Sequence, residues 1–179
     1  MVTKLAYGVA FQIGWFVCVA TNNFLSFIYT LLFSAIYLSL AKQPKDSLYK
    51  EFLWIVLVTS LGFILETISF SAGFLYSSAP TKFYVITFPP FWLVNLWILF
   101  AVALRTCLTF VFEKPLLTYL VSSIAIPINY YAGAALNDDV AVNDPYLISL
   151  GLISVLWVSL LWLLNSVKRY YFEDIFNAR

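Results

Sequence analysis

Six long apolar stretches, separated by short polar segments, constrain this chain more than any other feature. A helix needs about 20 apolar residues to cross a bilayer, and the stretches are close to that length. The chain is 63% hydrophobic and 11% charged, whereas a typical soluble chain has about 25% charged residues. An open sheet cannot satisfy its backbone in lipid, so helices are expected. The sequence therefore predicts an all-α, polytopic membrane protein folded as a six-transmembrane-helix bundle.

We expect a single six-helix transmembrane domain over residues 1–167. The spans are expected at about 5–20, 24–41, 52–76, 90–112, 115–136 and 146–167. Pro90 and Pro115 suit the first turns of the fourth and fifth spans, because a proline there loses no helical hydrogen bond. Residues 168–179 mix charge with aromatic side chains and are expected to form a cytoplasmic interfacial tail.

The distribution of lysine and arginine predicts the orientation of the bundle. Of ten such residues, eight would lie on one side of the membrane. These are Lys4, Lys42, Lys45, Lys50, Lys114, Lys168, Arg169 and Arg179. Lys82 lies in a loop on the other side, and Arg105 lies inside a span. Because positive charge accumulates in cytoplasmic loops, both termini are expected in the cytoplasm.

Composition also excludes several classes of function. The net charge of +1 leaves no basic patch for nucleic acid. Histidine is absent, which removes the commonest metal ligand and any Ser-His-Asp triad. Without a metal-spaced Cys/His cluster or a phosphate-binding loop, we expect no metal and no cofactor. Catalysis, which the sequence neither requires nor excludes, would depend on Glu66, Arg105, the acidic loop 137–145 or tyrosines.

Five polar residues inside the predicted spans are candidates for an intramembrane binding site. They are Gln12, Glu66, Asn95, Arg105 and Asn129. An ionisable group in a span costs about 2.5–3.5 kcal/mol even by low estimates, and so indicates function by default. Small residues lie four positions from Glu66, Arg105 and Asn129, and such residues let helices approach closely. These three side chains are therefore expected to face the bundle interior.

Pro127 is expected to kink the fifth span. It cannot donate a backbone hydrogen bond, so the carbonyl of Ser123 is freed about one turn from Asn129. Glu66, Arg105 and Asn129 could then line a small polar cavity beside the kink.

A purely structural interpretation of the charged residues remains open. Glu66 and Arg105 could pair and lock the third and fourth spans together. Glu66 could instead be protonated and hydrogen-bonded, and Arg105 could extend toward the inner surface.

Three stretches resemble a family of small bacterial inner-membrane proteins of unknown function. They are residues 11–19 (FQIGWFVCV), 90–101 (PFWLVNLWILFA) and 127–133 (PINYYAG). The family pattern has Asp where this chain has Glu66. The resemblance implies a multi-pass protein of the bacterial inner membrane, often encoded near lipid-modifying enzymes, with no established reaction.

Three functions follow as hypotheses. The first is a protein that binds or helps to modify a membrane lipid, with Arg105 holding an anionic head group and Glu66 and Asn129 orienting it. The second is a small carrier or channel built from two inverted three-helix halves, because the loops after the first two spans of each half have similar lengths. The third is a structural or accessory subunit that contacts other membrane proteins.

Overall fold

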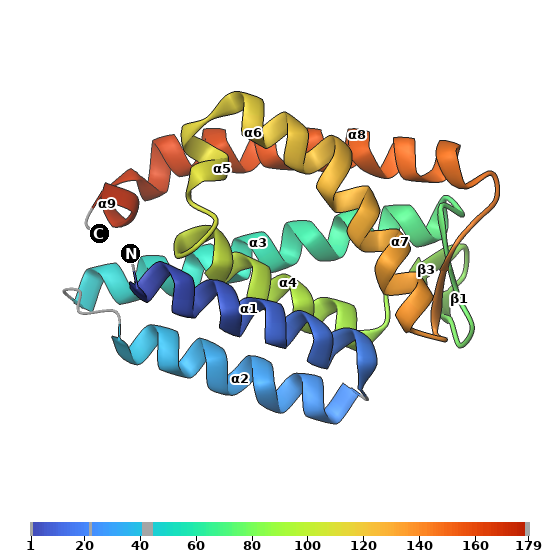
Figure 1. Ribbon diagram of the computed structural model, residues 1–179, viewed down its shortest axis with the longest axis horizontal. Helices are drawn as coiled ribbons and strands as arrows, with labels where there is room; N and C mark the ends of the chain where they lie inside the picture. Colours follow the sequence, from blue (N-terminus) through green and yellow to red (C-terminus); the bar gives the residue numbers. More distant parts are fainter. Residues whose placement is uncertain (1, 22, 41–44, 178–179) are drawn as a thin grey trace.

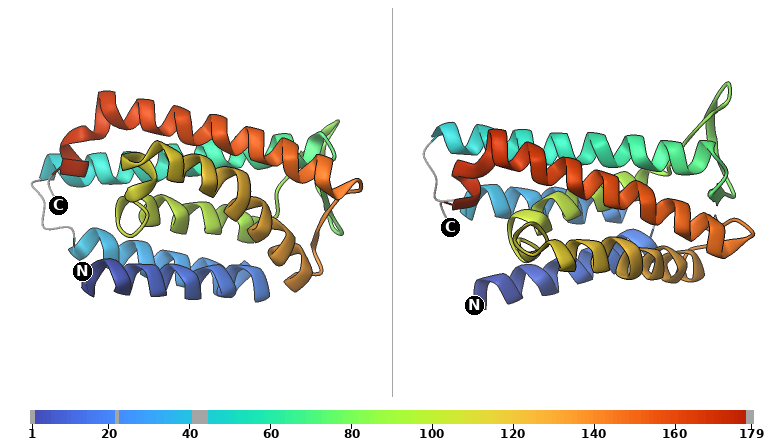
Figure 2. Two further views of the ribbon diagram at one scale, coloured as in Figure 1. Left: turned by 45° about the horizontal axis from the view of Figure 1, so that its top comes forward. Right: turned by 90° about the horizontal axis from the view of Figure 1, so that it is seen from above.

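The computed structural model describes residues 2–21, 23–40 and 45–177, most of which are helical. The helices are α1 (Val2–Ala20), α2 (Asn23–Leu40), α3 (Lys45–Ser71), α4 (Phe91–Arg105), α5 (Phe110–Glu113), α6 (Pro115–Leu120), α7 (Ile126–Leu136), α8 (Tyr146–Val167) and α9 (Glu173–Asn177). Two π-helical segments, η1 (Val121–Ala125) and η2 (Lys168–Phe172), connect α6 to α7 and α8 to α9. The long helices run along one axis (Figures 1 and 2). The all-α prediction is confirmed.

Several helices of the described chain are suited to a lipid environment. Four are long and apolar enough to cross a membrane: Thr3–Ala20, Asn23–Leu40, Leu48–Ser71 and Tyr146–Asn177. Helix α4 is also apolar but shorter. Large apolar side chains such as Leu31, Leu147 and Trp162 point outward and are exposed. Contiguous apolar surface of this extent indicates a membrane-embedded protein.

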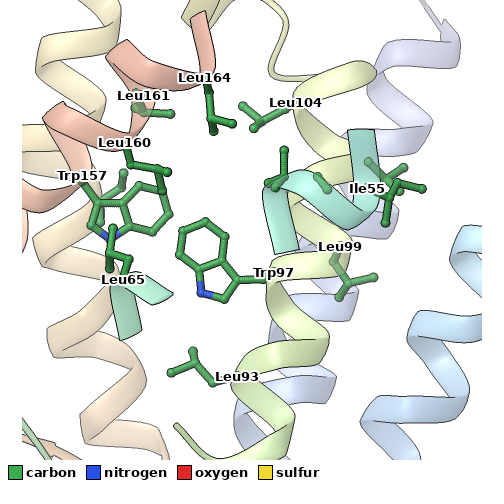
Figure 3. Packing of buried hydrophobic residues seen from close by; sticks show 14 of the residues in the cluster. Ile55, Leu65, Leu93, Trp97, Leu99, Leu104, Trp157, Leu160, Leu161 and Leu164 are labelled. Atoms are coloured by element: carbon green, nitrogen blue, oxygen red, sulfur yellow. The ribbon is translucent and has the colours of Figure 1, made fainter. Parts of the chain in front are cut away.

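Helix α4 is the centre of the bundle and packs against α1, α2 and α3. Leu99 and residues 101–104 on α4 are completely buried. The Trp97 ring stacks on Trp157 of α8, with centroids 4.6 Å apart (Figure 3). The ring also lies against Gly62 of α3, where an added Cβ would lie 2.0 Å from it. The absence of a side chain at position 62 therefore sets the position of Trp97.

Short strands close one end of the bundle, where the sequence analysis expected loops and the end of the span at 52–76; α3 instead ends at Ser71. β1 (Leu75–Ser77) pairs antiparallel with β4 (Val140–Val142), and β2 (Thr81–Phe83) pairs with β3 (Ile86–Phe88). Leu75, Val140 and Val142 are buried, while Tyr76 and Ala141 between them are exposed. The β1–β4 pair thus joins two distant connecting segments and turns apolar side chains toward the helices.

The fourth helix is shorter than the span predicted at 90–112. Helix α4 ends at Arg105, where the Leu108 amide donates to the Ala103 carbonyl at 2.8 Å and Thr106 Oγ1 donates to the Val102 carbonyl at 2.8 Å. Residues 106–114, including α5, then lead to α6. The connection between α4 and α6, expected to be a two-residue turn at Glu113 and Lys114, therefore covers residues 106–114. The similar loop lengths behind the two-halves hypothesis are absent from the structure.

The C-terminal tail packs into the bundle more than the sequence suggested. Phe172 and Ile175 are buried, and Trp54 of α3 lies between Phe172 and Phe176, with centroid distances of 5.4 and 5.2 Å. Tyr170 and Tyr171 are exposed on the opposite face. The tail therefore covers one end of the core with one face and leaves an aromatic face outside.

Candidate functional site

A mostly apolar cavity of about 290 Å³ lies between α1, α3, α4, α7 and α8. Leu75 and Val140, from the β1–β4 pair, contribute to its wall at the strand end of the bundle. The polar groups among its lining residues belong to Gln12, Trp15, Glu66, Trp92, Trp97, Asn129, Tyr130 and Trp157. Its size is close to the lower limit for small-molecule pockets, about 300 Å³, and its few convergent polar groups are also typical.

Glu66 is the polar centre of the pocket and is 1% exposed. Its Oε1 accepts hydrogen bonds from Tyr130 Oη and from Trp97 Nε1, the latter at 3.2 Å. Trp157 Nε1 in turn donates to Tyr130 Oη at 3.1 Å. Helices α3, α4 and α7 thereby meet at one carboxyl group, and α8 joins them through Tyr130. Such a network holds Glu66 in a fixed orientation.

Two residues that line the pocket each have a buried polar atom with no hydrogen-bond partner among the described residues. These atoms are Glu66 Oε2 and Trp92 Nε1. The other such atoms belong to residues that do not line this cavity. An unsatisfied buried donor or acceptor costs about 1–3 kcal/mol, and more when it is charged. A molecule in the pocket could satisfy both atoms.

The pocket reaches the side of the bundle between α1 and α7. Gln12 on α1 and Asn129 on α7 both line the cavity and are both exposed. Toward the strand end the two helices are joined, because Asn137 Nδ2 donates to the Val19 carbonyl at 2.6 Å. The pocket therefore has an exposed edge at the side of the bundle.

Near Pro127, where the sequence predicts a kink, the helix contains a π-helical turn. Segment η1 immediately precedes the proline, and the helix path bends there (Figure 1). The Asn129 amide donates to the Ala125 carbonyl at 2.8 Å, which satisfies a backbone group near the bend. The expectation that Asn129 faces the interior is wrong, because its side chain is exposed at the pocket edge. π-Bulges occur frequently at functional sites.

Arg105 does not line the pocket, and its ion-pair partner is Glu51, so the alternative in which it pairs with Glu66 is not the one observed. Its Nε donates to Glu51 Oε2 at 2.9 Å, and its Nη2 donates to Glu51 Oε1 and to the Ile175 carbonyl, the latter at 2.8 Å. Tyr37 Oη also donates to Glu51, and the Phe176 ring lies 4.3 Å from the guanidinium carbon. Arg105 has this unexpected partner because α3 begins earlier in the chain than predicted. α3 begins at Lys45, so Glu51, expected in a loop, is a buried helical residue near the end of α4.

Asn95 also lies outside the pocket. Its Nδ2 donates to Ser26 Oγ on α2 at 2.9 Å, in a buried contact between helices. Of the five candidates, the structure brings together Gln12, Glu66 and Asn129, and assigns Asn95 and Arg105 to packing. The sequence analysis missed the roles of Trp92, Trp97, Tyr130 and Trp157 because aromatic residues in spans usually serve packing. Three of these four lie in the stretches 90–101 and 127–133.

A family model covers nearly all of the chain, from residue 4 to residue 163, and is described as a protein of unknown function, DUF2878. The chain belongs to this family. No curated protein and no solved structure matches the chain.

The DUF2878 region contains every residue that lines the pocket, from Phe11 to Trp157. It also contains Glu51 and Arg105, whereas Ile175 and Phe176 lie beyond it. The pocket is therefore formed entirely within the matched region. The C-terminal residues that contact Arg105 lie outside it.

Proposed function

We propose that this protein binds a single membrane lipid in the pocket between α1, α3, α4, α7 and α8. The observation that carries the proposal is an apolar cavity, open on the lipid-facing side, that holds the unpartnered atoms Glu66 Oε2 and Trp92 Nε1. A lipid could enter sideways between α1 and α7 and place its polar group against Glu66. We propose binding because the cavity is mostly apolar and its few polar groups converge on Glu66, as in ligand pockets.

The proposal includes a six-helix, multi-pass arrangement in a bacterial inner membrane, with both termini in the cytoplasm. Helices α4 and α6–η1–α7 would supply the spans beyond the four long apolar helices. The start of α1 and the tail helix α9 lie at one end of the bundle, and strands β1 and β3 lie at the other (Figure 1); Lys82 belongs to β2, which pairs with β3. The charge asymmetry of the sequence favours this orientation.

The topology is tested with single cysteines in a variant lacking Cys18 and Cys107. Lys82→Cys and Lys114→Cys replace exposed residues at opposite ends. In intact cells a membrane-impermeant maleimide should label position 82 only, and position 114 should be labelled after permeabilisation. Labelling of both positions in intact cells would contradict the topology.

Lipid binding is tested by filling the cavity. Ala134 of α7 lines the pocket, whereas its neighbour Ala135 is exposed and does not. Native mass spectrometry of the purified protein should show a retained lipid for the wild type and for Ala135→Phe. Ala134→Phe should lose that lipid while keeping its helical circular dichroism spectrum. Equal retention by both variants would place the lipid elsewhere, and the absence of any retained lipid in the wild type would contradict the proposal.

A further inference from the structure

We infer that the pocket is specific for an uncharged apolar alcohol, a long hydrocarbon or isoprenoid chain ending in a hydroxyl group. This inference rests on the proposed function and adds the chemical class of the ligand. Three features of the pocket carry it: the two unpartnered polar atoms, the absence of cationic side chains from its wall, and the chemistry of the remaining surface.

The first feature is the requirement set by Glu66 Oε2 and Trp92 Nε1. An ionised carboxylate oxygen needs a donor, and a protonated one offers its own hydrogen to an acceptor. The indole N–H of Trp92 needs an acceptor. A hydroxyl group donates one hydrogen bond and accepts two. It therefore serves Glu66 in either protonation state, and it can also serve Trp92.

The second feature excludes the common anionic lipids. No lysine or arginine is among the described residues that line the pocket. Arg105, the basic residue buried in the bundle, already binds Glu51 and the Ile175 carbonyl. A phosphate or carboxylate head group would therefore lie beside Glu66 without a counter-ion, and burial of an unpaired charge is strongly unfavourable.

The third feature is the apolar remainder of the wall. Phe11, Trp15 and Phe100 line the cavity together with aliphatic side chains. Gln12 and Asn129 add polar groups at the exposed edge, and Trp15 adds its indole N–H; the Asn129 amide already donates to the Ala125 carbonyl. A chain anchored by its hydroxyl at Glu66 could leave through this edge and continue into the surrounding lipid. Apolar burial supplies affinity, and the two polar atoms select the head group.

The experiment measures competition between ligands that differ only at one end. The purified, delipidated protein in detergent receives an equimolar mixture of a long-chain alcohol, the carboxylate of equal length and the corresponding hydrocarbon. Native mass spectrometry resolves the three adducts. In the wild type the alcohol adduct should exceed each of the others by about tenfold, the ratio expected for one buried hydrogen bond to a carboxyl group.

Variants then test the two anchoring atoms. Glu66→Leu should reduce the alcohol-to-hydrocarbon ratio by about tenfold, and Trp92→Phe should reduce it several-fold, because each removes a hydrogen-bonding partner. Matched controls are Glu113→Gln and Trp162→Phe, which change exposed residues outside the pocket. Both controls should keep the wild-type ratio. Should Glu66→Leu not fold, Trp92→Phe and the wild-type series still decide the question.

The outcomes separate the two proposals. A wild-type protein that prefers the carboxylate, or binds hydrocarbon as well as alcohol, would overturn the alcohol specificity and leave lipid binding intact. The second of these results would also mean that water alone occupies Glu66 Oε2. If no adduct forms with any of the three ligands, and Ala134→Phe behaves as the wild type, the proposed function itself fails.

Discussion

At the scale of single residues, the buried charges have separate roles. Glu51 and Arg105 satisfy each other, with further contacts from Tyr37 and the Ile175 carbonyl. Glu66, about 22 Å further along α3 by helical rise, has one oxygen satisfied and one unpartnered. A closed ion pair of this kind maintains the fold, whereas a half-satisfied carboxyl group in a cavity is available to a ligand. The sequence identified Glu66 and Arg105 as candidates and left their pairing open, but it missed Glu51 as the partner of Arg105, because Glu51 lay at the boundary of an apolar stretch.

Removing one member of the Glu51–Arg105 pair should destabilise the protein strongly. Arg105→Met leaves a buried carboxylate without its counter-ion, and such changes cost about 3–5 kcal/mol. The double variant Glu51→Gln with Arg105→Met should recover much of that loss, since no charge is then left unpaired. Unfolding in sodium dodecyl sulfate measures both effects. Lys50→Met is the control, because the Lys50–Asp174 pair is partly exposed and such pairs contribute about 0–1 kcal/mol.

Gly62 should tolerate no side chain. A Cβ at this position would lie 2.0 Å from the Trp97 ring, so Gly62→Ala should displace the indole that donates to Glu66. Overpacking of this kind costs about 1–3 kcal/mol, and lipid retention should fall with it. In Gly151→Ala, where no heavy atom lies within 4 Å, helix propensity predicts a gain of up to about 1 kcal/mol. Equal stability of the two variants in detergent unfolding would show that Trp97 can move at no cost.

At the scale of elements, apolar length predicted the helices well and their ends poorly. The apolar stretch continues through Phe112, so nothing in the composition marks the end of α4 at Arg105. The strands have three residues each, which is too short for an alternating pattern to be recognised. The pocket itself was partly predictable, since residues 11–19, 90–101 and 127–133 each contribute to its wall. Their convergence depends on the order of helix packing, which the sequence alone does not specify.

The tail element should be necessary for stability although it lies outside the DUF2878 region. Ile175 is 1% exposed, and its carbonyl accepts a hydrogen bond from Arg105. Ile175→Ala should destabilise the protein by about 2–5 kcal/mol, the range for large-to-small changes in a core. Tyr171→Ala, on the exposed face of the same segment, should change stability by less than about 0.5 kcal/mol. Chemical unfolding of the two variants in the same detergent gives the comparison, and equal effects would mean that the tail does not cover the core.

At the scale of the whole molecule, the bundle is closed at the strand end and open at its side. The β1–β4 pair and the Asn137–Val19 contact hold the connecting segments and the ends of α1 and α7 together. Further along these helices, Gln12 and Asn129 line the same pocket and remain exposed. In the proposed function, a lipid would reach Glu66 through this edge without any opening of the strand end.

Joining α1 to α7 across that edge should therefore slow the exchange of bound lipid. Gln12→Cys and Asn129→Cys, in a variant lacking Cys18 and Cys107, provide attachment points for a flexible bismaleimide. After cross-linking, the rate at which a retained lipid is replaced by an isotope-labelled one should fall at least about tenfold, as followed by native mass spectrometry. Each single-cysteine variant treated with a small monofunctional maleimide should exchange much faster than the cross-linked protein. Unchanged exchange after cross-linking would mean that the ligand reaches Glu66 by a route other than the space between α1 and α7.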